Sequence, residues 1–228
     1  MSIRVLLADD QALLRGTFRL LIDSCEDMGV VGEAADGREA VDLTRVYRPD
    51  IVLMDIRMPG TDGLAATAAI CDDPGLAGTR ILVLTMFETD EYVAKALRVG
   101  ASGFLGKYVT TDALLAGIRT VAAGEALLSP GATRALITRF LTAPAPGALL
   151  APAERLNDLT PREREVTTLA ARGKSNDKIA EELFLSVLTV RSHIQRALTK
   201  LGARDRAQLV VIAYQTGLVR PPRHSPET

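Results

Sequence analysis

Five residues in the first half of this sequence have side chains that could do chemistry together. An acid pair, a third acid, a hydroxyl and an amine each come at the end of a short apolar run: Asp9, Asp10, Asp55, Thr85 and Lys107. If the runs are strands of one parallel sheet, their carboxyl ends meet at the edge where open α/β sheets bind ligands. Three carboxylates, a hydroxyl and an ammonium at one edge suit a divalent cation together with a phosphoryl group.

The acids predict a particular cation and a particular reaction. Asp9 and Asp10 are adjacent and expected close to Asp55, so all three could ionise cheaply only beside a cation. A few hard oxygen ligands favour Mg²⁺, which keeps some waters and accepts a phosphoryl oxygen. Asp55 ends the predicted middle strand and is the best-placed nucleophile for forming an acyl phosphate. Lys107 would neutralise the phosphoryl oxygens, and the Thr85 hydroxyl would bond to one of them.

Alternating strands and helices are predicted to position these residues. Short runs rich in Val, Ile and Leu are typical of buried strands and occur at 3–8, 30–34, 50–55, 80–85 and 102–106. Amphipathic segments predict helices at 11–24, 37–47, 62–72, 89–99 and 110–124. Five strand–helix repeats imply an α/β fold of the (βα)5 type, a doubly wound parallel sheet with helices on both faces.

The second half of the sequence differs in charge and in pattern. Residues 1–125 carry 12 Lys and Arg against 19 Asp and Glu, a net charge of −7, whereas residues 126–228 carry 15 against 9, a net charge of +6. This asymmetry indicates two domains with different partners, the basic one suited to a phosphate backbone. We expect a first domain at 1–125, a linker with a short helix at 126–155, an all-α domain of four helices at 156–220 and a flexible tail at 221–228.

Start signals in the basic half predict short helices joined by tight turns. Thr160 and Glu163 have the spacing of a capping box. Ser175 or Asn176 opens the next predicted helix, and Ser186 opens the one after it. Short helices with such joints are typical of a helix-turn-helix.

The helix that follows Ser186 has two predicted faces. Apolar residues at 3.6-residue spacing form the buried face: Val190, Ile194, Ala197, Leu198 and Leu201. Candidate DNA-contact residues lie on the opposite face or flank it: Lys178, Leu188, Thr189, Arg191, Ser192, Gln195, Arg196, Thr199 and Lys200. Leu188 either touches a thymine methyl group or is merely tolerated there. His193 is interpreted as a packing or hydrogen-bonding residue at the edge of the buried face.

Two kinds of DNA contact are predicted from these residue types. Arg191 and Gln195 lie four positions apart and suit guanine and adenine edges in a major groove. Lys178, Arg196 and Lys200 suit phosphates beside that groove.

Residues 2–124 resemble the receiver domain of bacterial two-component response regulators. The matching motifs are the acid pair near the start, D-x-R-M-P-G in the middle, LT, and then GFLGK. The resemblance implies that Asp55 is the phosphoacceptor and that Asp9 and Asp10 hold Mg²⁺ with it. It also implies that the backbone carbonyl of Arg57 completes the metal shell.

The same resemblance implies a switch pair made of Thr85 and Phe104, acting with Lys107. Phe104 stands where the family often has Tyr, so an aromatic rotation is retained but the hydroxyl of that Tyr is absent. Gly106 replaces a usual aliphatic residue, and Tyr108 follows the Lys. We therefore expect the end of the fifth strand to be looser than normal.

Residues 156–218 resemble the LuxR-type helix-turn-helix domain through LTPRERE, ARGKSNDKIAEEL, and S-x-x-TV-R-x-H followed by KLGARDR. A receiver domain followed by this domain is the architecture of NarL/FixJ-family response regulators. The resemblance implies a transcription factor, not an enzyme, that is phosphorylated on Asp55 by a sensor histidine kinase. Phosphorylation would change the switch surface and modulate homodimerisation and sequence-specific binding to double-stranded DNA. RNA polymerase is a further candidate partner.

Three other classes of protein are alternatives to this interpretation. A phosphatase of the aspartyl-phosphate type would need a second carboxylate two residues after Asp55, where Arg57 stands. A regulator that senses a small molecule would need an aromatic-lined pocket, and the acidic cluster argues against one. The closest alternative is a DNA-binding regulator that works without phosphorylation and keeps a receiver-like domain as a structural part.

The remaining sequence features concern location. Cys25 and Cys71 have neither metal-ligand spacing nor a secretory context, and we expect both to be reduced. The start of the chain meets acids too early for a signal peptide. No uncharged apolar stretch approaches the roughly 18 residues needed to span a bilayer. We therefore expect a soluble, cytoplasmic protein that does not associate with membranes.

Overall fold

The computed structural model describes residues 2–86, 90–125 and 153–219. The chain divides into two compact units, Met1–Ser129 and Pro130–Thr228. Each unit has a hydrophobic core of its own. Among the helices of the described segments, none has the length and apolar character needed to cross a membrane.

The first unit is built on a five-stranded sheet with the order β2-β1-β3-β4-β5, in which all pairs are parallel. Its strands are β1 (Ile3–Ala8), β2 (Met28–Ala34), β3 (Ile51–Met54), β4 (Arg80–Thr85) and β5 (Gly103–Gly106). The central strands are almost continuous runs of buried Val, Ile and Leu, as expected for a sheet covered on both faces. The predicted (βα)5 sheet is therefore confirmed.

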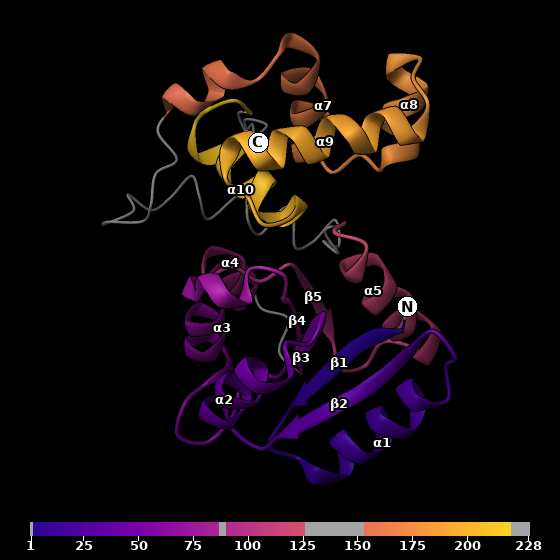
Figure 1. Ribbon diagram of the computed structural model, residues 1–228, viewed down its shortest axis with the longest axis vertical. Helices are drawn as coiled ribbons and strands as arrows, with labels where there is room; N and C mark the ends of the chain where they lie inside the picture. The colour runs from indigo at the N-terminus through magenta and orange to yellow at the C-terminus, as the bar shows by residue number, and fades with distance from the viewer. Residues whose placement is uncertain (1, 87–89, 126–152, 220–228) are drawn as a thin grey trace, which may run out of the picture. The chain divides into compact units, whose positions relative to one another are not determined.

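Helices cover both faces of this sheet (Figure 1). They are α1 (Ala12–Asp23), α2 (Gly37–Tyr47), α3 (Gly63–Asp72), α4 (Asp90–Arg98) and α5 (Thr111–Ala122), with a 3₁₀ turn, η1 (Pro74–Leu76), after α3. α1 and α5 share one face, where Ile22 and Ile118 pack in a core with Leu53 and Leu82 of the strands. α2, α3 and α4 lie on the other face (Figure 1). The η1 turn was not predicted.

The second unit is helical throughout its described part. It contains α7 (Pro161–Ala171), α8 (Asn176–Leu183), α9 (Val187–Leu201) and α10 (Arg206–Gln215), preceded by a 3₁₀ helix, η2 (Ala153–Asp158). The four predicted helices are confirmed, whereas η2 was not predicted.

The helix starts in this unit follow the predicted caps. Thr160 and Glu163 form the capping box of α7, each side chain accepting a hydrogen bond from the other residue's backbone N–H. Ser175, rather than Asn176, caps α8, and Ser186 caps α9. The sequence therefore marks where the helices of the helix-turn-helix begin.

The predicted linker helix near the start of 126–155 and the predicted tail at 221–228 lie outside the described residues. The predicted limits of the two domains accordingly stay predictions.

Candidate functional site

Four of the predicted site residues lie at the carboxyl ends of strands in the first unit. Asp9 follows β1, Asp55 follows β3, Thr85 ends β4 and Lys107 follows β5. The strand order puts β1 beside β3, β3 beside β4 and β4 beside β5, so residues distant in the sequence meet at one edge. This edge is where ligands bind in open parallel sheets.

The three acids form a cluster that can hold a cation. Asp9, Asp10 and Asp55 each offer a carboxylate oxygen within 4.8 Å of the others. Asp9 and Asp55 are each only 5% exposed, whereas Asp10 is exposed to solvent. Two buried carboxylates and one that faces water fit a partly hydrated Mg²⁺ better than an ion enclosed by protein ligands.

Lys107 joins two of these acids. Its Nζ lies 2.6 Å from Asp9 Oδ2 and 2.8 Å from Asp55 Oδ2, and its side chain is 2% exposed. Burial raises the pKa of the Asp55 carboxyl, although the hydrogen bond and charge of Lys107 act in the opposite direction. Burial alone would lower the pKa of Lys107, but its hydrogen bonds with Asp55 and Asp9 outweigh this and raise the pKa. The ammonium therefore stays charged between the two carboxylates.

The Asp55 carboxylate is also held by the backbone around it. Its Oδ1 accepts a hydrogen bond from Ile56 N at 2.8 Å, and its own N–H donates to Ala8 O at 2.8 Å. The other carboxylate oxygen, Oδ2, faces Lys107. One oxygen is thus fixed by the chain, and the other lies where a phosphoryl group could be neutralised by an ammonium.

The predicted switch pair lies on β4, which is next to β3, and on β5 beyond it. Thr85 is 2% exposed and Phe104 is 5% exposed. The Thr85 carbonyl accepts a hydrogen bond from Lys107 N at 2.8 Å, which ties β4 to the residue after β5. The Arg57 guanidinium carbon lies 5.9 Å from the centre of the Tyr92 ring, within the range of a cation–π contact.

Two residues that shape this site were not predicted from the sequence. Gly63 begins α3, and a Cβ there would lie 1.8 Å from the Asp55 carbonyl oxygen, so only glycine lets the helix start so close to the site. A signal was present, because Gly63 directly follows Asp62, whose side chain caps α3. Arg15 of α1 donates a hydrogen bond from Nη1 to the Asp9 carbonyl oxygen at 2.6 Å. No sequence motif signalled that contact.

The second candidate site is the outer face of α9. All five residues predicted for its buried face are buried. The residues predicted to project from the opposite face are all exposed: Leu188, Arg191, Ser192, Gln195 and Thr199. Arg196 is exposed beside this face, and Lys178 is exposed in the first turn of α8. The predicted division of α9 into a core face and an outward face is confirmed.

Hydroxyl groups on the outward side of α9 are engaged within the helix. Ser192 Oγ donates to Leu188 O at 3.0 Å, and Thr199 Oγ1 donates to Gln195 O at 3.1 Å. Thr189 Oγ1 lies 2.8 Å from the Oγ of the cap residue Ser186. These three hydroxyl groups therefore already have partners on α9 or in its cap residue.

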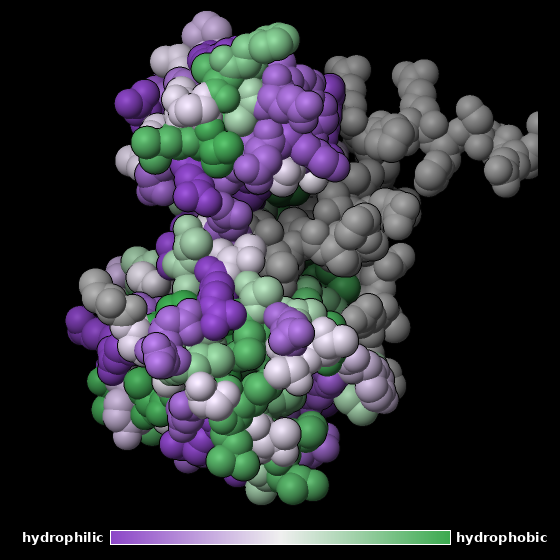
Figure 2. Space-filling model, turned by 90° about the vertical axis from the view of Figure 1, so that its right-hand side faces the viewer, coloured by the Kyte–Doolittle hydropathy of each residue, from purple (hydrophilic) through white to green (hydrophobic). Residues whose placement is uncertain are grey.

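Apolar side chains also reach the surface of this unit. Leu188 is 74% exposed on the outward face of α9, and Phe184 is 96% exposed just before it. Figure 2 shows green, hydrophobic surface among purple, hydrophilic surface on one side of this unit. An exposed Leu188 fits either alternative left open for it.

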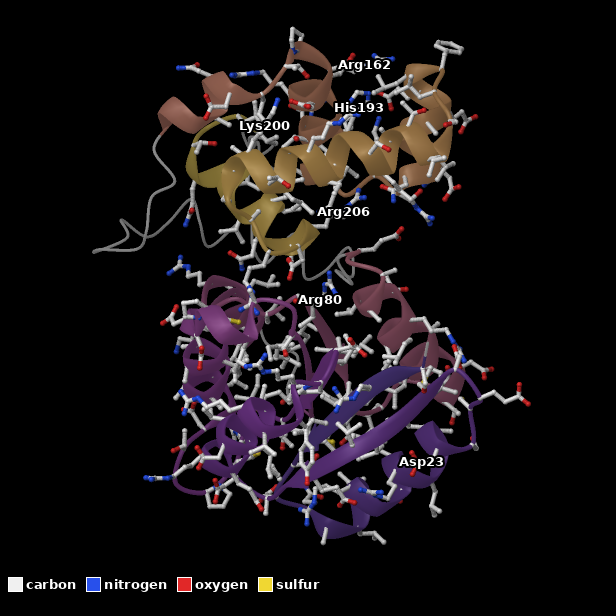
Figure 3. All side chains as sticks on the ribbon, in the orientation of Figure 1. Asp23, Arg80, Arg162, His193, Lys200 and Arg206 are labelled. Carbon is white, nitrogen blue, oxygen red and sulfur yellow. The ribbon has the colours of Figure 1, made fainter. Side chains whose placement is uncertain are left out.

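Lys200 also has a partner within the second unit. Its Nζ lies 2.7 Å from Glu163 Oε2, and Glu163 is 3% exposed, so Lys200 connects α9 to the capping box of α7. The hydrogen bond from Lys200 lowers the pKa of Glu163 to about 2. Figure 3 shows Lys200 on α9 near the end of the helix. Lys200 therefore makes an ion pair with α7, and its predicted contact with a DNA phosphate stays a prediction.

His193 is partly buried on α9 (Figure 3). Its Nδ1 is buried and has no hydrogen-bond partner among the described residues. Of the two roles expected for His193, packing or hydrogen bonding, this observation fits packing.

Comparisons with known proteins give a family for each unit. The family described as "Response regulator receiver domain" matches residues 5–119, and "Bacterial regulatory proteins, luxR family" matches residues 157–213. The chain is 41% identical over 220 residues to the uncharacterized transcriptional regulatory protein YxjL of Bacillus subtilis, covering 96% of this chain and 98% of YxjL. The chain belongs to the NarL/FixJ family of response regulators.

Two further relatives extend this result. The oxygen regulatory protein NreC of Staphylococcus aureus is 38% identical over 217 residues, which are 95% of this chain and 99% of NreC. The crystal structure of the response regulator ChrA, from a heme-sensing two-component system, is 33% identical with a TM-score of 0.50, covering 96% of this chain and 99% of ChrA. This response regulator is a two-component transcription factor with a receiver domain and a LuxR-type DNA-binding domain.

Proposed function

We propose that this response regulator is switched by phosphorylation of Asp55. The observation that supports this most is the Lys107 ammonium, which lies within 2.8 Å of carboxylate oxygens of both Asp9 and Asp55 at the open edge of the sheet. A buried ammonium beside a carboxylate nucleophile is suited to a phosphoryl group, whose oxygens carry the charge that Lys107 would neutralise. Thr85, at the end of the next strand, would donate its hydroxyl to one of those oxygens.

The proposed donor is the phosphorylated histidine of a sensor kinase. A carboxylate oxygen of Asp55 attacks the phosphorus atom, the P–N bond breaks, and the imidazole leaves with the electron pair of that bond. Asp9, Asp10 and Asp55, with the Arg57 backbone carbonyl, would hold Mg²⁺, which supplies positive charge to the phosphoryl oxygens when bound. Lys107 moves with the new phosphoryl group, and the contact between Lys107 N and Thr85 O offers a route from that movement to the Thr85 and Phe104 pair.

The second unit is proposed to bind double-stranded DNA with α9 in the major groove. Arg191 and Gln195 would contact base edges, whereas Lys178 and Arg196 would contact phosphates. One helical domain of this size makes few phosphate contacts, so useful affinity requires a dimer on paired half-sites. Phosphorylation would favour that dimer and, through it, recruitment of RNA polymerase.

The decisive experiment is phosphate uptake from acetyl phosphate by the full chain, followed by phosphate-affinity electrophoresis. We expect uptake only with Mg²⁺ present and none in Asp55→Asn, because the amide is nearly isosteric but is not a nucleophile. Asp62→Asn is the matched control, since Asp62 only caps α3, and it should take up phosphate normally. Undiminished labelling of Asp55→Asn would refute the assignment. An unphosphorylated wild-type protein that still binds its operator fully would favour a regulator independent of phosphorylation.

A further inference from the structure

Arg15, in the first turn of α1, contacts the backbone of the acid pair. Its Nη1 donates a hydrogen bond to the Asp9 carbonyl oxygen at 2.6 Å. Its Nε lies 3.4 Å from Glu33 Oε2 on β2, and its side chain is only 16% exposed. A guanidinium is rarely this buried unless its donors are used, and here one points at the acidic edge of the sheet.

The carbonyl that Arg15 holds belongs to the peptide bond between Asp9 and Asp10. The atoms of a peptide bond lie in one plane, so a donor fixed on the Asp9 oxygen also fixes the direction in which the Asp10 backbone leaves. The Asp9 side chain is independently held, with Oδ1 accepting from Gln11 N at 2.9 Å and Oδ2 facing Lys107 at 2.6 Å. The Asp10 side chain is exposed, so the direction of its carboxylate depends mainly on the orientation of this peptide plane.

We propose that Arg15 is a positioning residue for the metal site, which it serves by orienting the Asp9–Asp10 peptide so that both carboxylates can bind one Mg²⁺. This role rests on the proposed function of the acidic cluster. Groups that orient metal ligands without touching the metal typically change metal affinity about 10–100-fold when removed.

A neighbouring residue provides a matched control. Arg19 lies one turn further along α1, and its Nε is 2.5 Å from Glu33 Oε1, the other oxygen of the same carboxylate. Arg19 also lies 3.8 Å from Asp23, which stands at the end of α1 (Figure 3). Both arginines therefore pair with Glu33, but it is Arg15 that donates to the Asp9 carbonyl.

The test is calorimetric titration of Mg²⁺ into the unphosphorylated full chain, which needs no phosphoryl transfer. We expect Arg15→Met to weaken Mg²⁺ binding about 10-fold or more and Arg19→Met to weaken it less than about 2-fold. The midpoint temperature of unfolding without Mg²⁺ should fall in both variants, because each loses an ion pair with Glu33. Arg15→Met also loses the hydrogen bond to the Asp9 carbonyl, and Arg19→Met also loses the pair with Asp23. Arg15→Lys keeps the charge but lacks the planar fork that reaches two acceptors at once, so its affinity should lie between those of wild type and Arg15→Met.

The possible outcomes distinguish the proposed role of Arg15 from the proposed metal site on which it rests. Wild-type Mg²⁺ affinity in Arg15→Met, or equal weakening in Arg19→Met, would overturn the positioning role while leaving the metal site intact. If Arg15→Met does not fold, unchanged affinity in Arg15→Lys overturns the role and weakened affinity supports it. Wild-type binding that Asp55→Asn and Asp10→Asn do not alter would overturn the metal site, and the role of Arg15 with it.

Discussion

The acidic edge of the first unit and the outer face of α9 are built in opposite ways. At the edge, Asp9, Asp55 and Lys107 follow three different strands, and their side chains are nearly excluded from water and paired with one another. On α9, the candidate reading residues come from one helix of 15 residues and stand exposed, with Arg191 and Gln195 one turn apart.

This difference follows from what each site has to meet. A phosphoryl group is small, so its charges must be met by groups already held in place and shielded from water. A DNA duplex is large and presents bases and phosphates along its grooves. The protein therefore needs exposed side chains that contact these groups when the DNA binds. Single substitutions should therefore disturb the fold at the edge and disturb only binding on α9.

The largest expected effect comes from removing the buried ammonium. Lys107→Met leaves two buried carboxylates without their cation and should lower the free energy of unfolding of the first unit by about 3–5 kcal/mol. Lys178→Met removes an exposed charge and should change stability by less than about 0.5 kcal/mol. Urea unfolding of both variants measures the difference between these two losses of unfolding free energy. Mg²⁺ should stabilise Lys107→Met more than wild type. Equal, small effects would show that the edge is not preorganised as described.

A second prediction concerns reading of bases on α9. Arg191→Ala or Gln195→Ala should relax the preference at particular operator positions, by about 1–3 kcal/mol for each good bidentate pairing with a base. Stability should hardly change, since both side chains are exposed. The measurement is binding to a panel of operators with single-base substitutions. An equal reduction of affinity for every operator would mean that the two residues meet phosphate instead.

A third prediction tests the place where the DNA-binding unit does rely on a buried charge. Glu163→Gln keeps an acceptor for Thr160 N but removes the ion pair with Lys200, and should lower the unfolding free energy by about 1 kcal/mol at neutral pH. The exposed control Glu165→Gln, which removes a pair with Arg162 on the same helix, should cost less. Hydrogen exchange of the α7 and α9 amides in urea would report both changes.

The same ion pair predicts a pH dependence. The pKa of Glu163 is lowered from 4.5 to about 2 in the folded protein, so its contribution is complete above pH 4.5 and is lost as pH falls towards 2. The stability difference between wild type and Glu163→Gln should therefore shrink over that interval. A difference that stays constant from about pH 7 to about pH 2 would contradict the pairing.

The smallest expected effect is at the flanks of the reading face. Lys178→Ala or Arg196→Ala should weaken binding to all operators alike and reduce the slope of log affinity against log salt by about one contact. Binding to two operators at two or more salt concentrations measures this. A change in base preference, with the salt slope unaltered, would mean that these residues contact bases instead of phosphates.

Most of the secondary structure could be predicted from the sequence because its signals are local. Buried parallel strands appear as short apolar runs, and caps such as Thr160 and Ser186 act within three residues of the helix start. The two faces of α9 follow from the 3.6-residue period alone. The residues of the acidic edge could be named for a related reason, since each stands where a predicted strand stops.

The contacts that hold these residues in place were decided only by the tertiary structure. Lys107 meets Asp9 and Asp55 because the ends of β1, β3 and β5 converge, and Lys200 meets Glu163 because α9 packs against α7. Arg15 reaches a backbone carbonyl, and every residue has one, so no residue type could mark it. Side-chain type and period are properties of the chain, whereas the distance between two side chains depends on how distant segments pack. In this protein, that packing buries the charged groups of the acidic edge and leaves those on the outer face of α9 exposed.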